Sequence, residues 1–92
     1  MATIVFFEDI NFKGQSRSYH AGIDDLGGFG HKVSSLIVAD GYWKVYEKPH
    51  FQGPGYDVSF EGGPKDDGRY PNYSDWGGPN DKLMSAQPEP QM

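Results

Sequence analysis

The side chains in this sequence that most readily do chemistry are three histidines, and they stand far apart. His20, His31 and His50 occur singly, without the neighbouring ligands that a metal-binding motif needs. A zinc site made of His31 and Asp81 is conceivable and is the less favoured interpretation. The chain contains no cysteine, which excludes disulfide frameworks, zinc–thiolate sites and thiol nucleophiles.

Two glutamates raise the possibility of hydrolysis by paired carboxylates. Glu8 and Glu47 occupy equivalent positions of an internal repeat, so a solvent-facing position repeated by symmetry is the simpler explanation. No Ser-His-Asp arrangement is visible. The pairs Gly27-Gly28 and Gly77-Gly78 precede neither a helix nor Lys-Ser/Thr, as a phosphate-binding loop would require. We therefore expect no enzymatic activity.

Charge and composition exclude further classes of function. The net charge is −5, and the eight Lys and Arg are scattered, so binding to nucleic acid or to an anionic membrane is not expected. The longest apolar runs, Ile4–Phe7 and Leu36–Ala39, are too short to span a bilayer. No signal peptide is visible, which predicts a cytoplasmic protein, or a secreted one whose signal has been removed.

An internal repeat organises the chain. Residues 7–14 and 46–53 share the frame aromatic-Glu-x-x-x-aromatic-x-Gly. Residues 25–35 and 75–85 share Asp, two Gly, Lys and a final Ser. The second half carries about eleven more residues than the first, and we assign them to Glu61–Asn72. The chain is therefore two copies of a motif of roughly forty residues.

Strand signals predict an all-β fold. Gly 13 and Pro 7 in 92 residues leave no room for long helices, and the 14 aromatic residues argue against disorder. Trp43 and Trp76 are expected in the core or against the hairpins, with sugar stacking by Trp76 as an alternative. The predicted strands are Thr3–Glu8, Ser16–His20, Val33–Ala39, Trp43–Glu47, Gly55–Phe60 and Lys82–Ala86. Four short strands per copy predict two Greek-key motifs that form a two-sheet β-sandwich.

The repeated frame resembles the signature of the βγ-crystallin family, in which the segment forms a folded hairpin in each Greek key. The resemblance covers residues 2–87 and is closest to single-domain, calcium-binding members outside the vertebrate lens. It implies one domain over residues 1–87, with Greek keys at about 2–41 and 42–87, and a flexible tail at 88–92. The residues that match the structural motif are Phe7, Phe12, Gly14 and Ser35 in the first copy and Tyr46, Phe51, Gly53 and Ser85 in the second. In the family, the serine hydrogen-bonds over the folded hairpin.

The resemblance also implies two calcium sites built from a loop in each copy, Asn/Asp-Asn/Asp-x-x-Ser/Thr-Ser, with one ligand exchanged between the loops. The first site would take the carbonyls of Glu8 and Lys32, the hydroxyl of Ser34 and the carboxylate of Asp81. These oxygen ligands suit Ca²⁺. The second site would take the carbonyls of Glu47 and Lys82, together with Met84 and His31, whose sulfur and nitrogen atoms suit a hard cation poorly.

We therefore expect a monomeric calcium-binding structural protein with one working site and one degraded site, in which Ca²⁺ stabilises the fold. Two alternatives remain open. One is a secreted interaction module, a protease inhibitor, toxin or lectin-like protein, that binds its partner through the loop Glu61–Tyr73. The other is a calcium-independent structural protein of the lens type.

Overall fold

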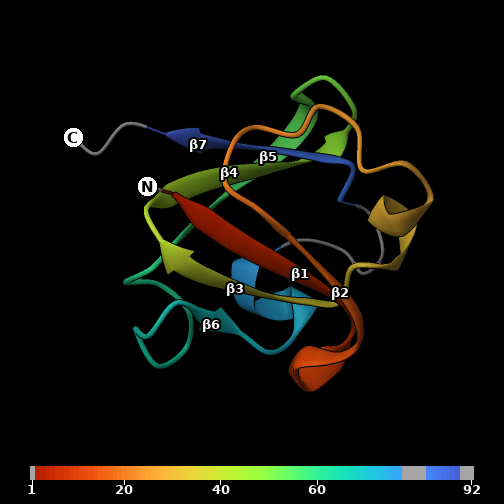
Figure 1. The fold of residues 1–92 in the computed structure, drawn as a ribbon. Helices are drawn as coiled ribbons and strands as arrows, with labels where there is room; N and C mark the ends of the chain where they lie inside the picture. The colour runs from red at the N-terminus through yellow and green to blue at the C-terminus, as the bar shows by residue number, and fades with distance from the viewer. Residues whose placement is uncertain (1, 78–82, 90–92) are drawn as a thin grey trace.

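Two antiparallel sheets packed face to face make up the protein, in a computed structural model that describes residues 2–77 and 83–89 (Figure 1). The predicted all-β sandwich is confirmed. Its strands are β1 (Thr3–Asp9), β2 (Lys13–Tyr19), β3 (Ser35–Asp40), β4 (Tyr42–Lys48), β5 (Gln52–Ser59), β6 (Arg69–Tyr70) and β7 (Ser85–Glu89). Three short 3₁₀ turns connect them: η1 (Ile10–Phe12), η2 (Gly27–Lys32) and η3 (Tyr73–Trp76).

The two repeats exchange segments between the sheets. The first sheet has the order β2-β1-β3-β6, so that β6 of the second repeat lies along β3 of the first, as Figure 1 shows. The second sheet has the order β5-β4-β7, and Ile23 of the first repeat forms an isolated bridge with Ala86 of β7. Each repeat therefore completes the sheet of the other.

Alternation along the strands places the core between the sheets. In β1, Ile4 and Phe6 are fully buried while their neighbours are half-buried, and in β4 Trp43 and Val45 follow the same pattern. This period of two is what a strand with one buried face produces. The other buried apolar side chains are Leu26, Phe29, Val33, Leu36, Val38, Val58, Tyr70, Trp76, Leu83 and Ala86.

The two folded hairpins, residues 7–14 and 46–53, have nearly the same geometry. The Phe7 and Phe12 rings meet edge to face with centroids 5.6 Å apart, and the Tyr46 and Phe51 rings do so at 5.9 Å. Each tip holds two residues at a φ near +60°, and each hairpin closes on a glycine with positive φ. At Gly14 a side chain would be strained, and its Cβ would lie 2.8 Å from the Asp9 carboxylate.

A buried serine fastens each hairpin to its own sheet. The Ser35 hydroxyl donates to the Asp9 carbonyl at 2.5 Å and accepts from the Phe12 N–H at 3.1 Å. In the second repeat, the Ser85 hydroxyl donates to the Lys48 carbonyl at 2.6 Å and accepts from the Phe51 N–H at 3.1 Å. These are the hydrogen bonds that the family resemblance implies for the two serines.

Most strand boundaries differ from those expected from the sequence: β2 begins at Lys13 rather than Ser16, and β5 begins at Gln52 rather than Gly55. The strand expected at Val33–Ala39 begins at Ser35, because Val33 and Ser34 form the exit from η2. The last strand runs from Ser85 to Glu89, and its pairing with Tyr42 and Trp43 places residues 88 and 89 in the sheet rather than in a tail. Strand β6 lies inside the segment assigned to extra residues, and only its contact with β3 defines it.

Candidate functional site

The first loop, residues 30–35, crosses the end of the first hairpin and brings three of the predicted ligand residues together. Ser34 is 6% exposed, and its N–H donates to the Phe7 carbonyl at 3.0 Å, which places it beside Glu8. The Lys32 ammonium lies 3.9 Å from the Glu8 carboxylate. Glu8, Lys32 and Ser34 therefore form one cluster, although 24 residues or more separate Glu8 from the other two.

Local structure explains how this loop is held. The Asp25 carboxylate accepts from the Gly27 N–H at 2.8 Å at the start of η2, and Phe29 and Gly30 are buried within that turn. The turn ends at Lys32, where Val33 returns to an extended conformation and is fully buried. A loop fixed at both ends can present main-chain oxygens with little loss of conformational entropy on ion binding.

The described end of the second loop, residues 83–85, meets the second hairpin in the same way but carries different chemistry. The Met84 N–H donates to the Tyr46 carbonyl at 2.8 Å, the counterpart of the Ser34 contact with Phe7. Met84 therefore lies beside Glu47, as Ser34 lies beside Glu8. The Glu47 carboxylate accepts a short hydrogen bond from the Tyr56 hydroxyl, which raises the pKa of that tyrosine.

The Met84 side chain occupies space that a residue larger than glycine at position 30 would need. A Cβ at Gly30 would lie 2.7 Å from the Met84 sulfur and 2.4 Å from the Leu83 carbonyl oxygen. Glycine in the first loop and methionine in the second are thus complementary in shape. His31, the other predicted member of the degraded site, is exposed.

Two predicted ligand residues, Asp81 and Lys82, lie outside the described residues, so their positions stay predictions. Within residues 2–77 and 83–89, no three His, Cys, Asp or Glu side chains gather in a way that could hold a metal ion. The atoms around Ser34 that could bind a metal ion are instead the oxygens of a hydroxyl group and of main-chain carbonyls. These fit a hard cation such as Ca²⁺, given an added carboxylate, better than a transition metal.

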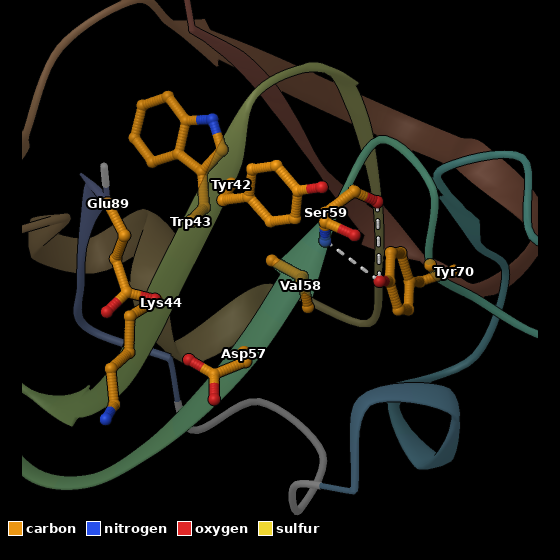
Figure 2. A pocket seen from close by; sticks show the side chains of 9 residues that line it. Tyr42, Trp43, Lys44, Asp57, Val58, Ser59, Tyr70 and Glu89 are labelled. Atoms are coloured by element: carbon orange, nitrogen blue, oxygen red, sulfur yellow. Dashed lines mark hydrogen bonds between the residues drawn. The ribbon is translucent and has the colours of Figure 1, made fainter. Parts of the chain in front are cut away.

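A hollow of about 670 Å³ that sequence reasoning missed is lined by residues from both faces of β4 and β5, by Glu89 of β7 and by Tyr70 of the first sheet. Figure 2 shows Glu89, Lys44 and Asp57 along one side of it, and Tyr42, Ser59 and Tyr70 toward the other. Burial raises the pKa of the Glu89 carboxyl, a hydrogen bond that the protonated carboxyl donates to the neighbouring Asp57 carboxylate and the negative charge of Asp57 raise it further, and Lys44 lowers it.

The Tyr70 hydroxyl at the other side of the hollow forms its hydrogen bonds with the main chain of Ser59. It accepts from the Ser59 N–H at 3.0 Å, and its distance to the Ser59 carbonyl is 3.5 Å (Figure 2). Burial raises the pKa of Tyr70, although these hydrogen bonds act in the opposite direction. The Tyr42 hydroxyl donates to the Glu61 carboxylate at 2.7 Å, which raises the pKa of Tyr42.

The signal that could have identified the charged face is the pairing of strands. Lys44 pairs with Asp57 on one side and with Gln87 on the other, so the three side chains share one face. The equivalent trio in the first sheet is Val5, Ser18 and Ile37, which carries no charge. Repeat symmetry therefore could have marked the charged face as a feature that the fold itself does not require.

No helix in the described part of the chain is long and apolar enough to cross a membrane.

Comparison with known proteins matches the chain to one family. The profile of that family, Beta/Gamma crystallin, matches residues 3–88. The "Beta/gamma-crystallin" of Ciona intestinalis is 37% identical over 89 residues, which are 95% of this chain and 98% of that protein. A solved structure of a Ciona beta/gamma-crystallin is 36% identical, with a TM-score of 0.84 and coverage of 95% of this chain and 99% of that one.

Two further matches widen the range of relatives. "Gamma-crystallin S" of Cyprinus carpio is 34% identical over 87 residues, which cover 95% of this chain and 46% of that protein. A beta/gamma-crystallin of Methanosaeta thermophila, described as transition-metal-ion-binding, has a solved structure with a TM-score of 0.72 at 27% identity. It covers 91% of this chain and 96% of that one.

Proposed function

The chain belongs to the beta/gamma-crystallin family, and on that premise we propose that it is a calcium-binding structural protein with one working site. The observation that carries the proposal is the contrast between Ser34 and Met84. Both make the same main-chain contact with a hairpin, but only Ser34 has a side-chain oxygen for a cation.

The proposed site consists of the hydroxyl of Ser34, the main-chain carbonyls of Glu8 and Lys32, and the carboxylate of Asp81. Ca²⁺ takes six to eight oxygen ligands at about 2.3–2.6 Å, so water would complete the shell. The contacts of Ser34 with Phe7 and of Lys32 with Glu8 support the proposal, because they bring three of the four residues to one place. Bound calcium would fasten the first loop to the first hairpin and to the loop that carries Asp81.

The second site is proposed to be inactive. A thioether and an imidazole are weak ligands for a hard cation, and the Met84 sulfur lies against Gly30. A transition metal is the less favoured alternative at either site. The relative described as binding such ions motivates its inclusion as an outcome of the test.

Calorimetric titration of the full chain with Ca²⁺ tests the proposal. We expect a stoichiometry near one, loss of binding in Asp81→Ala and unchanged binding in the matched control His31→Ala. Bound calcium should raise the melting temperature, since saturation to one hundred times Kd adds about 2.7 kcal/mol to the free energy of unfolding. Two equivalent sites, binding of Zn²⁺ or Ni²⁺ alone, or no binding would each contradict it.

A further inference from the structure

A second cavity lies between the first hairpin and the segment that the second repeat adds. This cleft, of about 260 Å³, is lined by Asn11 and Phe12 on one side and by residues between Pro64 and Pro71 on the other. More than fifty residues of chain separate its two walls. It does not share residues with the proposed calcium site.

The cleft contains two cationic side chains without an anionic partner. Lys65 and Arg69 line it, and neither forms an ion pair within 4.0 Å among residues 2–77 and 83–89. Asp67 also lines the cleft, and its carboxylate accepts from the Arg69 main-chain N–H at 3.1 Å. The cleft thus carries two cationic side chains and one carboxylate, in a protein whose acidic residues outnumber its basic ones by 13 to 8.

The walls of the cleft are held in place before any ligand arrives. The Asn11 N–H donates to the Pro71 carbonyl at 2.7 Å, which joins the two walls, and the Phe12 ring packs edge to face on Phe7. Gly63 and Gly68 have φ values of +93° and +79°, and a Cβ on either would lie 2.4 Å from a main-chain oxygen. The segment therefore has little freedom to rearrange, which reduces the entropy lost on binding.

The second repeat supplies an internal comparison. The His50 N–H at the tip of the second hairpin donates to the Asp24 carbonyl at 2.6 Å, as that of Asn11 does to Pro71. There, however, the facing side chains pair with each other, with the His50 ring nitrogen 3.3 Å from the Asp24 carboxylate. The fold thus needs the main-chain contact but does not need two cations beside it.

We propose that this cleft binds a small organic oxyanion, a carboxylate or a phosphate monoester, with Arg69 and Lys65 as its ligands. The planar guanidinium of Arg69 matches two oxygens of such a group, and Lys65 adds a second positive charge. Phe12, Pro64 and Pro71 provide apolar walls for the carbon atoms attached to it. The volume is below the range of about 300–1,000 Å³ typical of ligand pockets, so it suits one small group, such as an acidic side chain or a chain terminus.

The test is a ¹⁵N–¹H NMR titration of the full chain with acetate in one arm and inorganic phosphate in the other. Ionic strength is matched with NaCl, and calcium is removed by resin because soluble chelators are themselves carboxylates. We expect saturable shifts concentrated on the amides of Asn11 and Arg69. The tighter of the two arms identifies which oxyanion the cleft prefers.

Three variants decide the result. Arg69→Gln and Lys65→Gln should each weaken binding by roughly tenfold, the loss expected for a charge-assisted hydrogen bond. The matched control Lys48→Gln, on the other hairpin, should bind as the unaltered protein does. Equal weakening in Lys48→Gln, unchanged affinity in both cleft variants, or unsaturable shifts spread over the surface would overturn the proposal. Because the titration contains no calcium, its outcome is independent of the calcium proposal.

Discussion

The two repeats share their hairpins and differ in what fills the spaces around them. Both hairpins have paired aromatic rings, two tip residues in the left-handed region, and a buried serine that binds the same two main-chain groups. The crossing loops differ, because Ser34 in one repeat corresponds to Met84 in the other. The fold thus requires the hairpin, whereas the side chains of the crossing loop can differ between the repeats.

The outer faces of the two sheets differ in the same manner. The positions Val5, Ser18 and Ile37 of the first sheet are uncharged, with Arg69 beside Ile37, whereas the second sheet carries Lys44 and Asp57 at the positions equivalent to Val5 and Ser18, and Glu89 lies nearby. Backbone pairing is the same at these positions. The protein therefore has one scaffold with two chemically distinct surfaces, and three experiments can test how far each difference depends on individual side chains.

The largest effect is expected from restoring oxygen ligands to the second loop. The double variant His31→Asp/Met84→Ser should raise the calcium stoichiometry from one to two, because the Met84 contact with Tyr46 already matches that of Ser34 with Phe7. At one hundred times Kd the added site would contribute about 2.7 kcal/mol to the free energy of unfolding. Calorimetry and thermal melts measure both quantities.

The control for this experiment is Met84→Ala, which removes the sulfur but supplies no oxygen. It should lose packing against Gly30 without gaining a second site. A stoichiometry that stays at one in the double variant would mean that the main chain, rather than the side chains, separates the two loops.

An intermediate effect is expected at Gly30. Gly30→Ala places a Cβ against the Leu83 carbonyl and the Met84 sulfur, so we expect a loss of about 1–3 kcal/mol in the free energy of unfolding. Gly28→Ala lies in the same turn, where a Cβ would meet nothing within 4 Å, and should change stability by less than about 0.5 kcal/mol. Urea denaturation compares them, and equal losses would show that the contact with Met84 is unimportant.

The smallest effect is expected on the charged outer face. Because the pKa of Glu89 is raised above the ordinary value of 4.5, the folded protein holds this proton more tightly than the unfolded chain does. The stabilising contribution is therefore present below pH 4.5 and is lost as the pH rises through the folded pKa. Glu89→Gln should remove this loss and stabilise the protein near pH 7 by a few tenths of a kcal/mol at most, since the group is largely solvated.

Denaturation curves at several pH values measure this effect. Lys44→Gln serves as a control in which the effect on stability should have the opposite sign. Lys44 lowers the pKa of Glu89, so its removal should steepen the fall in stability above pH 4.5. A Glu89→Gln variant that is less stable than the unaltered protein at pH 7 would contradict the assignment of Asp57 as an unfavourable neighbour.

Much of the fold could be predicted from the sequence because the signals involved are local. The frame from Phe7 to Gly14, repeated from Tyr46 to Gly53, predicted both hairpins. Strand β6 was missed, because the two residues Arg69 and Tyr70 show no periodicity, and only pairing with Leu36 and Ile37 makes them a strand. The extension of β7 through Pro88 was missed for a similar reason, since proline is unfavourable in a strand and β4 supplies the partner.

The sequence by itself determined the repeat and the positions of the hairpins, because these depend on spacing along a few neighbouring residues. It also determined that the side-chain oxygens of Ser34 and Asp81, predicted for one site, are replaced by the sulfur of Met84 and the nitrogens of His31 in the other. Only the tertiary structure decided that Met84 covers Gly30, that Lys44 and Asp57 share a face with Glu89, and that Arg69 and Lys65 meet the first hairpin in a cleft. Each of these is a contact between distant segments, which chain folding creates and local spacing does not encode.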